Sequence, residues 1–264
     1  MAEFKIDRRR FLTAAGIGAA MLPLSGCDAF DSVLGDDAAV RNVLAKANDV
    51  TYRVQRALFG DEALAPEYSD SEIRQPMRPN GSTDPQTPEY LKLKQSDFAD
   101  YRLEVGGLVE NKLSLSLAEL RNMPSRTQVT RHDCVEGWSC IAKWSGVQLS
   151  RVLDQARVKP SARYVLFHCY DSMGDTFTGP QLYYETLDLV AARNPQTILA
   201  YGMNGSNLPV SNGAPLRVRV EQQLGYKMAK YIKSVELVSG FEKFAGGKGG
   251  YWEDTVGYDW YAGA

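Results

Sequence analysis

Histidine and cysteine are scarce in this sequence of 264 residues, which limits the chemistry that it can support. There are two histidines and four cysteines, and no Cys-x-x-Cys-His motif of the kind that attaches a c-type haem. The spacings of zinc fingers and zinc ribbons are also absent. Beyond the first 27 residues, no apolar run is long enough to span a membrane. No basic stripe suggests nucleic-acid binding, since 30 basic residues are balanced by 32 acidic ones.

The first 27 residues have the three parts of a bacterial export signal. Arg8-Arg9-Arg10 precedes Phe11-Leu12, an apolar stretch runs from Thr13 to Leu24, and Leu24-Ser25-Gly26-Cys27 matches the lipoprotein cleavage box. The apolar stretch is too short to remain in a bilayer as a permanent helix. The arginines fit the twin-arginine pattern, and an ordinary secretory signal is the alternative. We therefore predict twin-arginine export and acylation of Cys27.

The signal also limits the chemistry and the location of the mature protein. A chain exported in the folded state can carry a cofactor inserted in the cytoplasm, whereas a chain threaded unfolded cannot. The multiply acylated cysteine of a bacterial lipoprotein is a firm anchor, and Asp28 after Cys27 favours retention at the inner membrane. We expect a cofactor-containing protein anchored by its lipid at the periplasmic face of the inner membrane.

Residues 28–100 form a second segment, which is polar and poorly periodic. One helix is predicted around Ala38–Leu58, where apolar residues recur at helical spacing. Five prolines then indicate an irregular stretch that wraps or tethers instead of forming a core: Pro66, Pro76, Pro79, Pro85 and Pro88.

From residue 101 onward, short strands and short helices are mixed, which defines a main domain of residues 101–264. The predicted strands are Tyr101–Val105, Thr127–Thr130, Tyr164–Cys169, Leu216–Val220 and Ser234–Val238. The predicted helices are Ser116–Met123, which begins with a Ser116/Glu119 capping box, Gln148–Ala156 and Thr186–Ala192. Because strands and helices do not alternate regularly, we predict an α+β fold with mixed sheets.

The tail, Gly246–Ala264, is rich in glycine, tyrosine and tryptophan. We expect it to pack across the surface of the domain instead of binding a ligand.

Two short segments hold most of the reactive side chains. The first is Arg131–Cys140, and it contains His132, Cys134 and Cys140. The second is the pair His168-Cys169, at the end of an apolar predicted strand. Both segments are therefore candidates for a metal or catalytic site.

Three cysteines remain once Cys27 is acylated, which is an odd number for an oxidising compartment. At least one of them is therefore unpaired or serves as a ligand. A zinc site of these cysteines and a histidine is one alternative, although zinc gives no reason for folded export. A disulfide between Cys140 and Cys169 is another, and it would leave Cys134 free.

Three motifs follow one another in order along the main domain. They are Cys134-Val-Glu-Gly-Trp138-Ser with Trp144-Ser-Gly146, then Asn212-Gly-Ala-Pro-Leu-Arg217, then Gly225-Tyr-Lys-Met-Ala-Lys230. Together they resemble the sulfite oxidase superfamily, above all its exported bacterial branch of methionine sulfoxide reductase catalytic subunits. The resemblance extends from about Tyr101 to Val238. It implies a sulfite-oxidase-type fold and a cofactor of molybdenum and molybdopterin.

The same resemblance implies roles for individual residues. Cys134 would bind molybdenum through its thiolate, a soft donor suited to a high-valent metal. The expected cofactor-binding residues are Asn80, Cys169, Asn212, Arg217, Met228, Ala229 and Lys230. Arg217 offers a fork of donors to the phosphate of the pterin, and Gly213 allows the backbone to approach closely. Trp138 would wall the site, whereas Trp144 is expected in the core.

Three positions depart from that bacterial branch. His168 stands where the branch has an acidic residue, Cys169 where it has threonine, and Cys140 where it has methionine. These departures leave the substrate open while the cofactor motifs are kept. His132 and His168 are the candidates for proton transfer, because histidine titrates near neutral pH. A hydrogen-bonded structural histidine is the alternative for each.

We therefore expect a molybdopterin-dependent oxidoreductase that moves an oxygen atom to or from a small sulfur-centred substrate, either a sulfoxide or a sulfite-like compound. Because the chain has no haem motif, its electrons would be exchanged with an external partner, a membrane haem protein or a cytochrome c. The alternative is a non-catalytic lipoprotein binding module of the same fold, with or without zinc.

Overall fold

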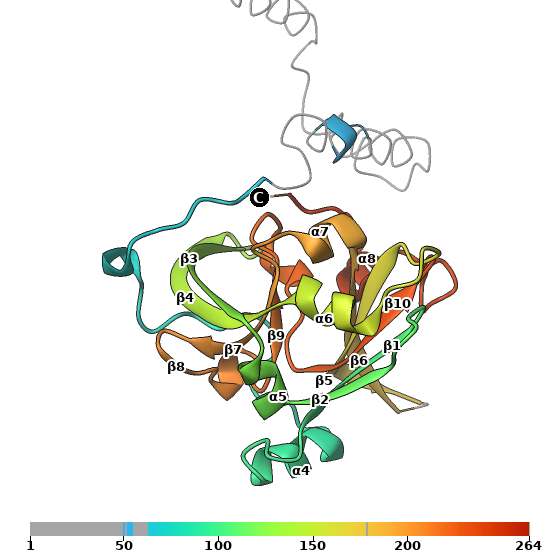
Figure 1. Ribbon diagram of the computed structural model, residues 1–264, viewed down its shortest axis with the longest axis horizontal. Helices are drawn as coiled ribbons and strands as arrows, with labels where there is room; N and C mark the ends of the chain where they lie inside the picture. The colour runs from blue at the N-terminus through green and yellow to red at the C-terminus, as the bar shows by residue number, and fades with distance from the viewer. Residues whose placement is uncertain (1–49, 51, 55–62, 178, 264) are drawn as a thin grey trace, which may run out of the picture. The chain divides into compact units, whose positions relative to one another are not determined.

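The computed structural model describes residues 50, 52–54, 63–177 and 179–263 (Figure 1). The predicted signal, with Arg8, Arg9 and Cys27, lies outside the described residues, as does most of the predicted helix Ala38–Leu58. Within the described part of the chain, none of the helices has the length and apolar character needed to cross a membrane.

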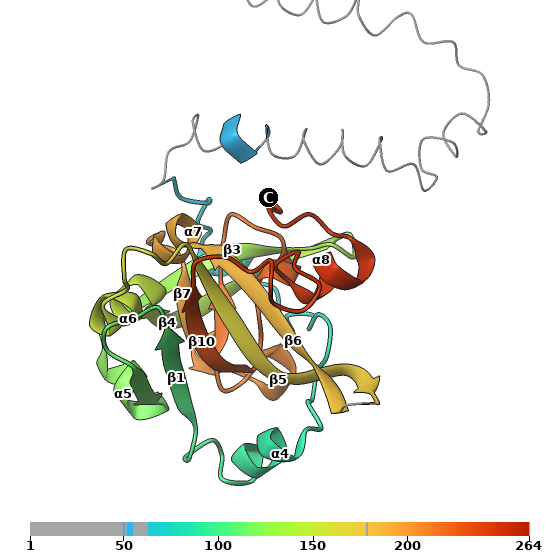
Figure 2. The same ribbon diagram turned by 90° about the vertical axis from the view of Figure 1, so that its right-hand side faces the viewer.

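Two five-stranded sheets carry the fold (Figures 1 and 2). The first has the order β2-β1-β10-β5-β6; the second has the order β3-β4-β7-β8, with β9 paired to β7. The first sheet contains β1 (Arg102–Gly107), β2 (Leu113–Ser116), β5 (Tyr164–Thr176), β6 (Gly179–Asp188) and β10 (Ile232–Val238). The second contains β3 (Ser125–Cys134), β4 (Trp138–Gln148), β7 (Ile198–Met203), β8 (Ser206–Asn207) and β9 (Arg217–Arg219). β1 and β10 pair in parallel, whereas the other pairs are antiparallel.

The helices are short and lie between or beside the strands. They are η1 (Asp70–Glu72), α4 (Pro88–Gln95), α5 (Leu117–Asn122), α6 (Leu149–Ala156), α7 (Leu189–Arg193), η2 (Val210–Asn212), η3 (Gly225–Lys227) and α8 (Tyr251–Val256). The predicted capping box is present, since Ser116 accepts from the Glu119 amide and Glu119 accepts from the Ser116 amide. Short helices and mixed sheets together confirm the predicted α+β class.

All five predicted strands are present, but several are longer than the sequence pattern indicated. Thr127–Thr130 is the middle of β3, and Tyr164–Cys169 is the first half of β5. The predicted helix Thr186–Ala192 is partly wrong: Thr186 still pairs with β5 as part of β6, and α7 begins at Leu189. The buried sheet partner outweighs the local helical pattern there. The strands β2, β4, β6, β7 and β8 were not predicted.

The proline-rich stretch passes over the surface of the domain (Figure 1). The Tyr68 amide donates to the Val129 carbonyl at 2.9 Å, and the Arg74 amide donates to the Ile141 carbonyl at 3.0 Å. The stretch ends in α4, whose first residue is Pro88, where the missing amide hydrogen costs nothing. This path brings residues 80–82 to the pocket described below.

Candidate active site

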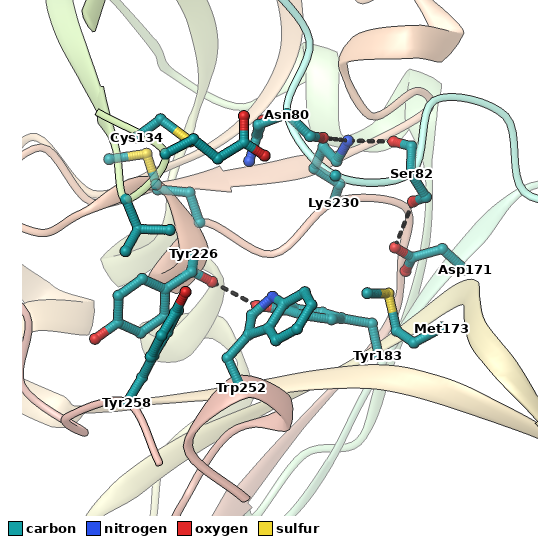
Figure 3. Close-up of a pocket in the computed structure, with 15 residues that line it drawn as sticks. Asn80, Ser82, Cys134, Asp171, Met173, Tyr183, Tyr226, Lys230, Trp252 and Tyr258 are labelled. Atoms are coloured by element: carbon teal, nitrogen blue, oxygen red, sulfur yellow. Dashed lines mark hydrogen bonds between the residues drawn. The ribbon is translucent and has the colours of Figure 1, made fainter. Parts of the chain in front are cut away.

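A pocket of about 160 Å³ opens where four distant parts of the chain meet (Figure 3). They are the loop 80–82, the turn after β3, the strands β5 and β6, and the segment that begins at η3. The tail 246–263 supplies a further part of the lining. The pocket therefore joins the proline-rich wrap, both sheets and the tail at one place.

Cys134 is held at the tip of the β3–β4 hairpin. It is the last residue of β3, and Cys134 pairs with Trp138 across a three-residue loop. The loop closes with a hydrogen bond of 3.0 Å from the Gly137 amide to the Cys134 carbonyl. Gly137 has φ +83°, the left-handed conformation that such loops require at their last position. The hairpin therefore fixes the thiol at the pocket lining.

The Cys134 thiol has a raised pKa, mainly because it is buried, while Arg78 and Lys230 act to lower it. A metal ion binds the thiolate and displaces the proton. The cysteine is therefore held as a thiol until a metal competes for the sulfur.

Arg217 and Asn212 form a buried cationic corner behind the pocket. Arg217 is fully buried on β9, and its Nη1 donates to the Asn212 carbonyl at 2.9 Å. Gly213, at φ +115°, lets these elements come close: a Cβ there would lie 3.1 Å from Lys230 Cβ and 3.3 Å from Arg217 Cβ. Burial, with a contribution from nearby Arg219, lowers the pKa of Arg217 to about 9. An anion bound here would relieve that cost.

Lys230 connects this corner to the loop 80–82. Its ammonium group donates to the carbonyl oxygens of Asn80 and Ser82, and the Ser82 hydroxyl donates to Asp171 Oδ2 at 2.8 Å (Figure 3). Burial and the charge of Arg217 lower the pKa of Lys230 to about 7. Burial raises the pKa of Asp171 to about 6. Both groups therefore change their charge near neutral pH.

Trp144 lies between two arginines, as a core residue and not as a pocket wall. Its ring centroid is 5.0 Å from Arg217 Cζ and 4.4 Å from Arg219 Cζ. Arg219 Nη1 lies 2.8 Å from His132 Nδ1. Because a guanidinium only donates, Nδ1 accepts and the proton of a neutral imidazole is on Nε2. Burial, then Arg219, lowers the pKa of His132 well below its ordinary value, so the ring is neutral.

Several buried polar atoms around this pocket have no hydrogen-bond partner. They are Asn80 Oδ1, His132 Nε2, Asp171 Oδ1, Asn212 Nδ2 and Arg217 Nε. Buried polar groups in native proteins are almost always paired. Asn80 and Asp171 line the pocket, whereas His132, Asn212 and Arg217 are buried outside its lining. Together with Lys230 they offer the donors and cations that suit a polar, anionic ligand. A pterin that ends in a phosphate has this chemistry, so the residues present fit the molybdenum cofactor.

The structure brings most of the predicted site residues together. Asn80, Cys134, Met228 and Lys230 line the pocket. Asn212, Arg217 and Ala229 are buried next to it in the chain, and Cys169 is fully buried on β5. These placements are consistent with the predicted cofactor-binding set.

The two histidines occupy different surroundings, and neither lines the pocket. His132 lies behind the pocket residue Gly225, where a Cβ would come within 2.5 Å of Nε2. His168 pairs with Glu236 on the neighbouring strand at 2.9 Å, and its ring contacts Phe244. The titratable side chains that do line the pocket include Glu136, Asp171 and Lys230.

The alternatives based on the other cysteines find no support in the structure. Cys134, Cys140 and Cys169 are all free thiols, so the disulfide between Cys140 and Cys169 is not formed. Within the residues that the structure describes, no three His, Cys, Asp or Glu side chains are grouped to hold a metal ion. The zinc site is therefore not assembled there.

Sequence reasoning missed three contributions to the pocket. Glu136 belongs to the Cys134 motif and could have been included on that ground. Asp171 gave no local signal. The tail, for which we expected a packing role, also lines the pocket through Trp252 and Tyr258. The density of aromatic residues in the tail was the available signal.

The family described as "Oxidoreductase molybdopterin binding domain" matches residues 90–243. A putative protein-methionine-sulfoxide reductase subunit YedZ1 of Azospira oryzae is 36% identical over 257 residues, which cover 97% of this chain and 88% of the relative. Protein-methionine-sulfoxide reductase catalytic subunits MsrP of Xanthomonas axonopodis pv. citri and Gluconobacter oxydans are each 36% identical, over 55% and 52% of this chain. The alignments span 47% of each MsrP, about half its length.

A solved structure shares the fold. The crystal structure of the sulfane dehydrogenase SoxCD from Paracoccus pantotrophus aligns with a TM-score of 0.51 and 22% identity. The alignment covers 61% of this chain and 42% of that chain. At this identity the likeness concerns the fold alone, and it agrees with the sulfite-oxidase-type architecture expected from the motifs.

Proposed function

Because this chain belongs to the family of oxidoreductases with a molybdopterin-binding domain, we propose that it reduces small organic sulfoxides. In that reaction a sulfoxide, two protons and two electrons give a thioether and water. The observation that carries the proposal is the placement of Cys134 at a pocket whose other residues leave buried polar groups unpaired. The names of the sulfoxide reductase relatives support the direction of the reaction.

Cys134 would hold the molybdenum, and the cationic corner would hold the pterin. The cofactor, when bound, would supply the two-electron exchange that oxygen-atom transfer requires. Arg217 and Lys230 carry the positive charge that a phosphate needs, and the Asn212 amide offers an unpaired donor beside them. These residues bind and orient the cofactor.

Asp171 is placed to hold one of the protons that the reaction consumes. It lines the pocket, its Oδ1 has no partner, and its pKa is raised to about 6. A general acid works best when its pKa is near the working pH. We assign this role to Asp171 because His132 and His168 do not line the pocket. Glu136 is a second carboxyl group at the same pocket.

A redox-dye assay tests the reaction. Enzyme purified from a molybdate-replete host should contain stoichiometric molybdenum, and it should oxidise a reduced dye in the presence of methionine sulfoxide. Sulfite with an oxidised dye tests the opposite direction, which is the second candidate. A protein without molybdenum and without either activity would support a non-catalytic binding module and contradict the proposal.

The electron donor and the location complete the proposal. We assign electron supply to an external haem protein, since the sequence has no c-type haem motif. Acylated Cys27 would hold the enzyme at the periplasmic face of the inner membrane, near such a partner.

Replacement of Arg8 and Arg9 by lysine should leave the precursor in the cytoplasm. Normal export of that variant, measured by cell fractionation, would contradict the twin-arginine route.

A further inference from the structure

Four aromatic side chains line one side of the pocket, which we call the aromatic wall: Tyr183, Tyr226, Trp252 and Tyr258. Figure 3 shows this wall across the pocket from Asn80 and Lys230. The Tyr226 and Tyr258 rings are 5.0 Å apart, and the Trp252 and Tyr258 rings are 6.2 Å apart. Trp252 and Tyr258 come from the tail, which lies beyond the family match that ends at residue 243.

The tail is held in place by hydrogen bonds to the domain. The Tyr226 hydroxyl donates to the Asp259 carbonyl at 2.6 Å, and the Leu224 amide donates to the Ala262 carbonyl at 2.8 Å. Trp260 Nε1 donates to the Thr186 hydroxyl at 2.8 Å. The aromatic wall is therefore built before a substrate arrives, and its rings need no ordering on binding.

A buried ionic cluster, Lys227 with Glu185 and Glu253, fixes the part of the tail that carries Trp252. The Lys227 ammonium group contacts the carboxyl groups of Glu185 on β6 and Glu253 on α8. All three side chains are essentially fully buried. Because Glu253 is the neighbour of Trp252, this cluster ties the α8 side of the aromatic wall to β6.

The two sides of the pocket differ in chemistry. The side with Lys230 and Asp171 is polar and charged, whereas the aromatic wall offers ring faces. Rings of this kind bind alkyl and aryl groups, and they make favourable contacts with sulfur. A small inorganic anion such as sulfite has no apolar group to place there. An organic sulfoxide has both a polar S=O group and apolar substituents.

We propose that Trp252 and Tyr258 form a specificity-determining subsite, supplied by the tail, that takes the organic substituent on the sulfur of the substrate. This inference rests on the proposed sulfoxide reduction. The S=O group then faces the polar side of the pocket, while the substituent packs on the aromatic wall. Substrates with larger apolar substituents gain from this contact, and dimethyl sulfoxide gains little.

The test compares two substrates in the molybdenum-loaded enzyme. Trp252→Ala and Tyr258→Ala should each lower kcat/KM for methyl phenyl sulfoxide about 10-fold, mainly through KM. The value for dimethyl sulfoxide should change less than about 2-fold. Trp252→Phe keeps a ring and should retain most of the selectivity. Val256→Ala is the matched control, because Val256 lies on the same helix, is exposed and does not line the pocket.

Molybdenum content and circular dichroism of each variant separate a lost subsite from a lost fold. Equal losses on both substrates, or unchanged selectivity in both folded and loaded alanine variants, would overturn the subsite. A loaded wild-type enzyme that reduces neither sulfoxide would instead overturn the proposed function, and the inferred substrate class with it.

Discussion

The two sides of the pocket are stabilised in opposite ways. On the cofactor side, which comprises Cys134, Asn212, Arg217 and Lys230, cations lie close together and buried polar atoms lack partners. On the aromatic wall, the hydroxyl groups of Tyr183 and Tyr226 donate to backbone carbonyls, and the rings contact one another. The cofactor side is thus arranged for a ligand that completes it, whereas the aromatic wall is complete when the chain has folded.

Of the substitutions considered, Cys134→Ser should have the largest effect, and it acts on the cofactor side. Loss of one indispensable catalytic group typically lowers kcat by about 10⁴-fold or more, and serine is a poor substitute for a soft thiolate ligand. We expect sulfoxide reduction to be lost and molybdenum content to fall, as measured by dye assay and elemental analysis. A variant that keeps both would refute the assignment of Cys134 as the ligand.

Lys227→Met should damage the aromatic wall instead. It removes the cation between two buried glutamates, and breaking such a buried ion pair costs about 3–5 kcal/mol of unfolding free energy. Burial already raises the pKa of Glu185 well above its ordinary value. Without the cation the Glu185 carboxyl group holds its proton more strongly in the folded state, so the variant loses further stability as pH rises. Denaturant unfolding at several pH values measures both effects.

Glu253→Gln is the control for that substitution. The amide keeps an oxygen that accepts from Lys227, and Glu185 remains as the charged partner, so the loss should be smaller than in Lys227→Met. Equal losses in the two variants would show that the ionic cluster does not hold the tail in the way inferred.

Arg217→Ala should weaken the cofactor side without unfolding the domain. Removal of one charge-assisted hydrogen bond costs about 1.5–3 kcal/mol, and pterin occupancy should fall accordingly. Pterin released from the purified protein can be measured by fluorescence after oxidation. Arg151→Ala, an exposed arginine on α6, is the control and should keep full occupancy. Full loading of Arg217→Ala would contradict the assignment.

In cofactor-free protein, Lys230 should give the smallest effect, which is a dependence of stability on pH. In the folded protein its pKa is lowered to about 7 from 10.5, so between these values the unfolded chain binds the proton more readily. The stability of cofactor-free protein should therefore rise with pH across this window. Lys230→Met should flatten the rise, as measured by thermal unfolding at pH 7 and pH 9. An unchanged slope would contradict the lowered pKa.

Local sequence patterns predicted those parts of the fold and site whose causes are themselves local. The capping box of α5 depends on Ser116 and Glu119 alone, and it was found where expected. Cys134 and the segment from Asn212 to Lys230 were singled out as motifs, and the structure places them around one pocket. By contrast, the local pattern placed Thr186 in a helix, because that pattern does not include Leu166, its pairing partner on β5.

Sequence motifs alone were enough to predict the α+β class, the likeness to a molybdopterin-binding family and Cys134 as the expected metal ligand. The side chains that surround Cys134 depend on the tertiary structure. It placed Asp171 in the pocket and left His132 and His168 outside its lining. It also placed Trp252 and Tyr258 of the tail in the aromatic wall. The physical reason is that burial, pairing and ring contacts depend on neighbours from distant segments, which no local pattern records.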